Sequence, residues 1–224
     1  MLKSEKNILW IMLPAIGLNV MLLLIRNAIE QDKSYNFLIF NLFLAFLPFL
    51  IAFLTWVIAP KLSRLFFIIL SLVWLLFYPN APYMMSDLIH VQAKSATVIY
   101  DTLIIFSFAT LALFLGFYSL NISYRLWIMK FNVQIARVWL IASVFLSSLG
   151  IYLGRILRLN SWDLFTRPME VFEETWNHLW PISHNPITYF IVALFTIIQF
   201  LIFWLGLRLG DIRLFPLALP ENKD

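Results

Sequence analysis

The sequence predicts an all-α membrane protein, a bundle of about six transmembrane helices with both ends in the cytoplasm and an amphipathic helix on its outer surface. Of the 224 residues, 62% are hydrophobic and 12% are charged, whereas soluble globular domains have roughly 45–50% apolar and about 25% charged residues. Six stretches are apolar over close to the 20 or so residues that a helix needs to cross a bilayer. Lys and Arg are also distributed unevenly between alternate connections, as in proteins with a fixed membrane orientation.

The predicted spans form a single membrane domain, residues 1–224. They are Ile8–Ile25, Phe37–Ala59, Leu62–Tyr78, Val98–Leu120, Val138–Leu153 and Ile187–Leu207. The third span is short and lies between Pro60 and Pro79, so it either crosses the bilayer with little tilt or re-enters on the same side. Pro48 lacks a backbone donor and is expected to kink the second span.

The distribution of charge predicts the orientation of these spans. With the N-terminus inside, the inner segments carry ten of the sixteen Lys and Arg residues, and the outer segments carry eight of the twelve acidic residues. Such a positive excess is typical of cytoplasmic loops, so we expect a multi-pass protein of the plasma membrane. The inner connection Asn121–Arg137 mixes basic and aromatic residues and is expected to rest as a loop on the anionic inner leaflet.

The composition restricts the partners and the chemistry. The chain has no cysteine, which excludes disulfides, thiolate catalysis and cysteine-ligated zinc sites. Its net charge of +4 is spread along the sequence and indicates contact with anionic lipid rather than with nucleic acid. The span centres hold neutral polar residues such as Asn19 and Gln199 but no charged ones. Since ion-coupled transporters keep ionisable groups near the midplane, a transporter is the less favoured class.

Polar residues gather in two blocks that this topology places at the outer surface. The first is Pro-Asn-Ala-Pro-Tyr-Met-Met-Ser-Asp-Leu-Ile-His over residues 79–90, and Tyr100-Asp101 follows at the start of the fourth span. The two prolines are expected to stop the third helix and to hold the chain extended. A helical turn from Ser86 would place Asp87 and His90 on one face. There they would either perform acid/base chemistry or serve as a helix cap and an interfacial side chain.

The second block follows the fifth span as Gly154-Arg155-Ile156-Leu157-Arg158-Leu159-Asn160-Ser161-Trp162-Asp163. If the helix continues, Arg155 and Arg158 lie one turn apart and suit a carboxylate or phosphate, or else anchor the helix at the headgroups. Asn160 and Asp163 add acceptors. The fifth span itself has a face of small residues that permits close helix contact, formed by Ser143, Ser147, Gly150 and Gly154.

A third polar segment, Thr166–Trp180, is predicted to be an amphipathic helix on the outer leaflet, acting as a brace or as a lid over the two blocks. Pro168 suits its first turn. Apolar residues recur at helical spacing, namely Met169, Phe172, Trp176, Leu179 and Trp180. The opposite face is polar and carries Glu170, Glu173, Glu174, Asn177 and His178.

At the two blocks the sequence resembles a bacterial multi-pass membrane family known as a domain of unknown function. The resemblance rests on Pro79-Asn80-Ala81-Pro82-Tyr83 with Asp87-Leu88 and His90, on Tyr100-Asp101, and on Gly154-Arg155 with Arg158, Asn160, Ser161, Trp162 and Asp163. It extends from about the second span to the last. Ser86 stands where the family usually has Thr, which preserves the hydroxyl. The resemblance implies six membrane helices and supplies no activity, substrate or cofactor.

Together the blocks predict a polar pocket at the outer face that binds or acts on an anionic lipid or a cell-envelope headgroup. Asp87 and His90 are the candidate acid/base residues, and the candidate binding residues are Asn80, Asp101, Arg155, Arg158, Asn160 and Asp163. No metal site is predicted, although His90, His178 and His184 with Asp87, Asp163 and Glu174 are ligand types for a zinc-like ion. Whether the protein is an enzyme stays open. The alternative is a non-enzymatic assembly or partner protein in which the same charged residues form internal salt bridges.

Overall fold

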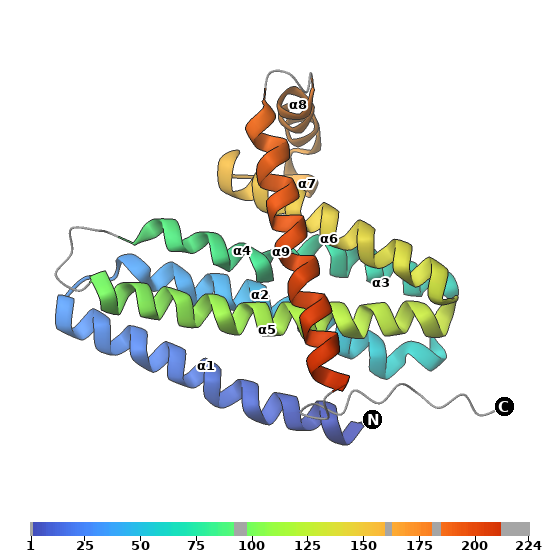
Figure 1. Cartoon of the computed structure of the whole chain (residues 1–224), viewed down its shortest axis with the longest axis horizontal. Coiled ribbons are helices and arrows are strands. Elements are labelled where there is room, and N and C mark those ends of the chain that lie inside the picture. Colours follow the sequence, from blue (N-terminus) through green and yellow to red (C-terminus); the bar gives the residue numbers. More distant parts are fainter. Residues whose placement is uncertain (1, 92–97, 160–162, 181–184, 212–224) are drawn as a thin grey trace.

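The computed structural model describes residues 2–91, 98–159, 163–180 and 185–211, and these contain helices, turns and no strand (Figure 1). The long helices are α1 (Leu2–Glu30), α2 (Phe37–Ile58), α3 (Arg64–Phe77), α5 (Val98–Lys130), α6 (Val133–Ile156) and α9 (Pro186–Asp211). The short elements are η1 (Ser34–Asn36), η2 (Ala59–Lys61), α4 (Asn80–Tyr83), η3 (Met84–His90), α7 (Asp163–Thr166) and α8 (Pro168–Leu179).

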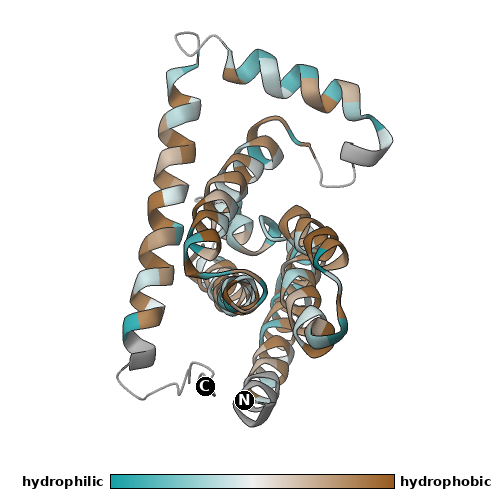
Figure 2. Cartoon of the chain, turned by 90° about the vertical axis from the view of Figure 1, so that its right-hand side faces the viewer, coloured by the Kyte–Doolittle hydropathy of each residue, from teal (hydrophilic) through white to brown (hydrophobic). Residues whose placement is uncertain are grey.

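Six helical segments are long and apolar enough to cross a membrane, which confirms the predicted all-α multi-pass fold. They are Trp10–Glu30, Ser34–Lys61, Arg64–His90, Val98–Lys130, Val133–Ile156 and Pro186–Arg208. Large apolar side chains cover their outer surfaces; Leu65 and Val138, for example, are 66% and 67% exposed. Soluble monomers rarely carry contiguous apolar patches of this extent, whereas lipid covers them at no cost. Figure 2 shows hydrophobic residues along the spans and a mixture of both kinds in α8.

The central helix of the bundle is α5, which packs against α1, α2 and α6. In Figure 1, α1 and α2 run alongside α5, whereas α9 crosses α5 and α6 steeply. Phe108, Ala112 and Leu115 of α5 are fully buried in the core. The amphipathic helix α8 lies beside the start of α9 and leaves Phe172 and Trp176 exposed. Its helical structure is as predicted, and its position on the outer leaflet stays a prediction.

The third span is longer than predicted. After a turn at Tyr78-Pro79 the chain becomes helical again through α4 and η3, so Arg64–His90 is long enough to cross the membrane. The prediction that the prolines hold this segment extended is wrong. Pro79 takes the N-cap position of α4 and Pro82 lies in its first turn, where a proline removes no intrahelical hydrogen bond because those N–H groups have no helical partner.

The predicted inner loop Asn121–Arg137 is instead mostly helical. α5 continues to Lys130 and α6 begins at Val133, where the Asn132 side chain caps it by accepting from the backbone N–H of Ile135 at 2.8 Å. Arg125 is buried rather than lying on the leaflet. Aromatic packing explains the extension, because Trp127 of α5 stacks on Trp139 of α6 with ring centroids 4.5 Å apart.

Three glycines allow the short helix α4 to pack between α5 and α6. A Cβ atom on Gly116 of α5 would lie 3.0 Å from the Cβ of Ala81, and one on Gly150 of α6 would lie 3.0 Å from the Cγ of Pro79. One on Gly154 would lie 3.3 Å from a ring carbon of Tyr83. The predicted small-residue face is therefore used for close packing, and it receives α4.

We expect Gly150→Ala to destabilise the protein by about 1–3 kcal/mol, because the added methyl group presses on the rigid ring of Pro79. The matched control is Gly17→Ala in α1, where no atom lies within 4 Å of the added Cβ and where Ala is favoured over Gly in a helix by roughly 0.5–1 kcal/mol. Thermal unfolding midpoints in one detergent would compare the two variants. A Gly150→Ala variant as stable as Gly17→Ala would contradict the close packing of α4.

Candidate functional site

Arg155, in the last turn of α6, is the centre of a polar cluster with three residues of η3. Its Nε donates to Ser86 Oγ at 2.9 Å, its Nη2 to Asp87 Oδ1 at 2.5 Å, and its Nη1 lies 2.9 Å from His90 Nε2. The turns of a 3₁₀ helix repeat every three residues, so Asp87 and His90 share a face as predicted. The guanidinium also stacks on the ring of Tyr83, 4.2 Å from its centroid. We refer to these five residues as the Arg155 cluster.

Asp87 is the buried member of this cluster. Its side chain is 1% exposed, and that of Arg155 is 14% exposed. The second carboxylate oxygen of Asp87 accepts from Asn41 Nδ2 of α2 at 3.0 Å. An ion pair that is buried but fully hydrogen-bonded fixes geometry well, because moving either charge leaves the other without its partner. Asp87 therefore orients Arg155 rather than facing solvent itself.

His90 is the exposed member of the cluster. A guanidinium only donates hydrogen bonds, so Nε2 of His90 accepts from Arg155 and the imidazole in this arrangement is neutral, with its proton on Nδ1. The ring packs edge-on against Phe37, with centroids 5.1 Å apart, and the backbone oxygen of His90 accepts from the hydroxyl of Tyr35 at 3.2 Å. These contacts fix both the position and the tautomer of His90.

Asp101 lies in a second ion-paired group rather than in the Arg155 cluster. Nε of Arg26 donates to its Oδ1 at 3.0 Å, and Nη1 of Arg26 bonds Asp32 Oδ2 at 3.0 Å. Hydrogen bonds from the Ser34 hydroxyl and from Arg26 hold the pKa of Asp32 below its ordinary value. Tyr35 connects the two groups, because its ring lies under the Arg26 guanidinium at 4.5 Å and its hydroxyl bonds His90.

The predicted pairing of Arg155 and Arg158 on one helix is wrong. α6 ends at Ile156, and Arg158 has the left-handed φ of 58°. Leu159 N–H then bonds Leu153 O at 3.2 Å, a six-residue closure that marks a Schellman-type helix end. Arg158 is consequently exposed and points away from the helical course that the sequence suggested.

The other predicted residues occupy different places. Asn80 donates from Nδ2 to Phe77 O at 2.9 Å beside the cluster's Tyr83. Asp163 is buried and pairs with Arg167 Nη2 at 3.3 Å. Asn160 lies outside the described residues. The binding roles proposed for these residues stay predictions.

Sequence reasoning missed Arg26, Tyr35 and Asn41, which contact the predicted residues. The available signals were weak, since Arg26 reads as a charge that ends the first span and Asn41 as an isolated amide in an apolar helix. Neither residue belongs to a motif, and their partners lie 75 and 46 residues away in the sequence.

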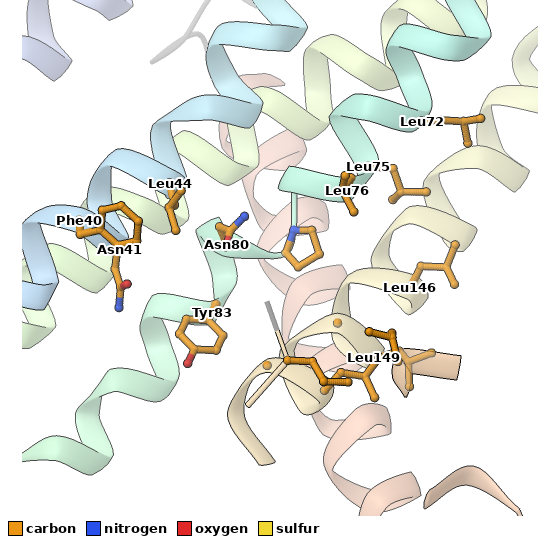
Figure 3. Close-up of a pocket in the computed structure, with 16 residues that line it drawn as sticks. Phe40, Asn41, Leu44, Leu72, Leu75, Leu76, Asn80, Tyr83, Leu146 and Leu149 are labelled. Carbon is orange, nitrogen blue, oxygen red and sulfur yellow. The ribbon is translucent and has the colours of Figure 1, made fainter. Parts of the chain in front are cut away.

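A cavity of about 430 Å³ adjoins the Arg155 cluster (Figure 3). Its polar lining comes from Asn41, Asn80 and Tyr83, which lie near one another in Figure 3, away from the leucines of α6. Asn41 also bonds Asp87, and Tyr83 also stacks on Arg155. The remaining lining is apolar and comprises Phe40 and Leu44 of α2, Leu72, Leu75 and Leu76 of α3, Pro79, five residues of α6 from Leu146 to Gly154, Leu159, and Val171 of α8. We call this cavity the lateral groove.

Within the described part of the chain, no group of three or more His, Asp or Glu side chains is placed to hold a metal ion. The cluster's chemistry is that of a rigidly held guanidinium with a neutral imidazole beside it. Such a pair suits an anionic oxygen ligand.

No curated protein and no solved structure matches the chain. A family model described as "Protein of unknown function (DUF1361)" matches residues 40–202, well over half of the chain. The matched region contains the whole Arg155 cluster and the lateral groove, while Arg26 and Asp32 precede it. The protein is therefore a member of the DUF1361 family, with helices suited to crossing a membrane several times.

Proposed function

We propose that this protein, in the bacterial plasma membrane, binds the anionic headgroup of a lipid or of another cell-envelope component. The site is the outer end of the bundle, where α6 meets η3. The observation that carries the proposal is the state of Arg155, a guanidinium that is oriented by Asp87, stacked on Tyr83 and still 14% exposed. Three of its five N–H groups donate to described residues, which leaves two for an anionic oxygen.

The local charge favours an anion as the ligand. Arg155 and the exposed Arg158 outnumber the one carboxylate of the cluster, Asp87. The rigid guanidinium presents planar, paired donors that match phosphate and carboxylate oxygens. His90 is exposed next to it with a proton on Nδ1, so it offers one more donor to a bound headgroup, or a proton to a reaction there.

Arg155→Lys tests this proposal, and Arg137→Lys, an exposed position on the same helix, is the matched control. We expect Arg155→Lys to reduce the preference for phosphatidylglycerol over phosphatidylcholine by about tenfold, the equivalent of one charge-assisted hydrogen bond. Native mass spectrometry of the purified protein titrated with each lipid would measure it. An unchanged preference in Arg155→Lys, or an equal loss in Arg137→Lys, would reject the site.

The burial of Asp87 supports a second candidate, a non-enzymatic assembly or partner protein in which the Arg155 cluster only fastens η3 to α6. On that hypothesis Arg155→Lys lowers stability and leaves lipid preference unchanged. The same titration therefore separates the two candidates, because headgroup binding predicts a change in selectivity and a fastening role does not.

A further inference from the structure

We infer that the lateral groove holds one hydrocarbon chain of the bound lipid, which enters sideways from the bilayer while its headgroup stays at Arg155. This inference rests on the proposed headgroup site and specifies the ligand as an anionic amphiphile. It follows from the lining of the groove, from its opening, from its size and from its continuity with the Arg155 cluster.

The lining of the groove changes from apolar to polar along one direction. Leucines of α3 and α6 form most of its walls, and the amides of Asn41 and Asn80 and the phenol of Tyr83 lie together in one region (Figure 3). A ligand that fills such a site has a hydrocarbon part and a polar part at one end. Water is a poor occupant of the apolar part, since it would find few hydrogen-bonding partners there.

The opening of the groove faces the region where lipid chains lie. Phe40, Leu72 and Leu146 line the groove and are 52%, 54% and 43% exposed. All three belong to segments that are apolar enough to cross a membrane. Their exposed surfaces therefore meet acyl chains, and a chain from a neighbouring lipid reaches the groove without passing through a polar layer.

The size of the groove favours a flexible chain over a helix of a partner protein. An α-helix with side chains is about 10 Å wide and rises 5.4 Å per turn, so about 430 Å³ accommodates roughly one turn. Val171 of α8 and Leu159 line the groove as well and are both buried, which limits how far a rigid rod extends past α6. A hydrocarbon chain bends to fit this space.

The polar region of the groove is continuous with the Arg155 cluster. Asn41 lines the groove and bonds Asp87 at 3.0 Å, and Tyr83 lines it and lies 4.2 Å from the Arg155 guanidinium carbon. Two residues therefore belong to both sites. A lipid whose chain lies along α3 and α6 places its headgroup at the guanidinium.

Photolabelling tests the groove directly. The full chain is reconstituted in phosphatidylcholine vesicles containing phosphatidylglycerol with a diazirine in its acyl chain, and labelled peptides are mapped by mass spectrometry. We expect labels to concentrate on the groove walls, between Leu72 and Leu76 and between Leu146 and Leu153. Leu75→Trp fills the groove, and Leu65→Trp, on the lipid-facing surface of the same helix, is the matched control.

Excluding about two methylene groups from the groove corresponds to about tenfold less labelling in Leu75→Trp, with no change in Leu65→Trp. Leu149→Trp, on the opposite wall, repeats the test if Leu75→Trp fails to fold. Labels spread evenly around the bundle, equal labelling in both α3 variants, or crosslinks from the groove to a second protein would overturn the inference. A phosphatidylcholine probe that labels the groove as strongly as phosphatidylglycerol would support the groove and contradict the headgroup proposal.

Discussion

Replacement of Asp87 by Ala is expected to destabilise the protein by about 3–5 kcal/mol, because it leaves the Arg155 guanidinium largely buried without its anion. Asn41 Nδ2 loses its acceptor in the same variant. The expected result is a large drop in the thermal unfolding midpoint of the purified protein in detergent, together with a lower protein level in the membrane.

Two comparisons make this result specific. Glu173→Ala removes an exposed acid of α8 and is expected to change the stability by no more than about 0.5 kcal/mol. The double variant Asp87→Leu with Arg155→Met removes both charges and is expected to be more stable than Asp87→Leu alone, since no unpaired buried charge remains. If the double variant is as unstable as the two single losses added together, the residues do not act as a pair.

Replacement of Arg26 by Ala is expected to have a comparable effect, about 3–5 kcal/mol, because Asp101 is 1% exposed and would be left as an unpaired carboxylate. The loss falls on the attachment of α1 to α5, since Arg26 belongs to α1 and Asp101 to the first turn of α5. The absence of natural cysteine allows a clean measurement. A Leu23→Cys reporter, at a fully buried position of α1, should become reactive to maleimide when Arg26 is replaced.

The control for this experiment is Arg137→Ala combined with Leu23→Cys, in which the reporter should stay protected because Arg137 is exposed on α6. Arg26→Met with Asp101→Leu should restore most of the protection, as removal of both charges leaves no unpaired ion. A reporter that stays protected in Arg26→Ala, with an unchanged unfolding midpoint, would show that the ion pair does not hold α1 in place.

The helices were largely predictable from the sequence. α2 begins at the expected Phe37 and ends at Ile58, one residue before the predicted boundary, because Pro60 follows and interrupts the helix. α5 and α6 extend beyond their apolar cores at the end where they meet. A hydropathy argument ends these spans at the first polar residues, whereas Trp127 and Trp139 stack across the two helices and keep both ends helical.

The candidate site was predictable only in part. Asp87, His90 and Arg155 meet as their motifs suggested, with Ser86 as a fourth partner. Arg158 departs because the last turn of α6 closes in a left-handed conformation, a detail of hydrogen bonding that favours glycine and that no glycine announces at that position. Asp101 pairs with Arg26, for which the sequence offered no reason.

The sequence by itself determined the class of this protein, since the cost of placing a backbone or a charge in lipid depends on each local stretch of residues. It also determined the small-residue face of α6, because glycine at that spacing admits a neighbouring helix whatever that helix is. Only the tertiary structure decided which carboxylate meets which guanidinium. Asp87 and Arg155 are 68 residues apart and Arg26 and Asp101 are 75 apart, and the partners are chosen by how α4 packs against Gly116, Gly150 and Gly154 and how α1 packs against α5, contacts that no local pattern encodes.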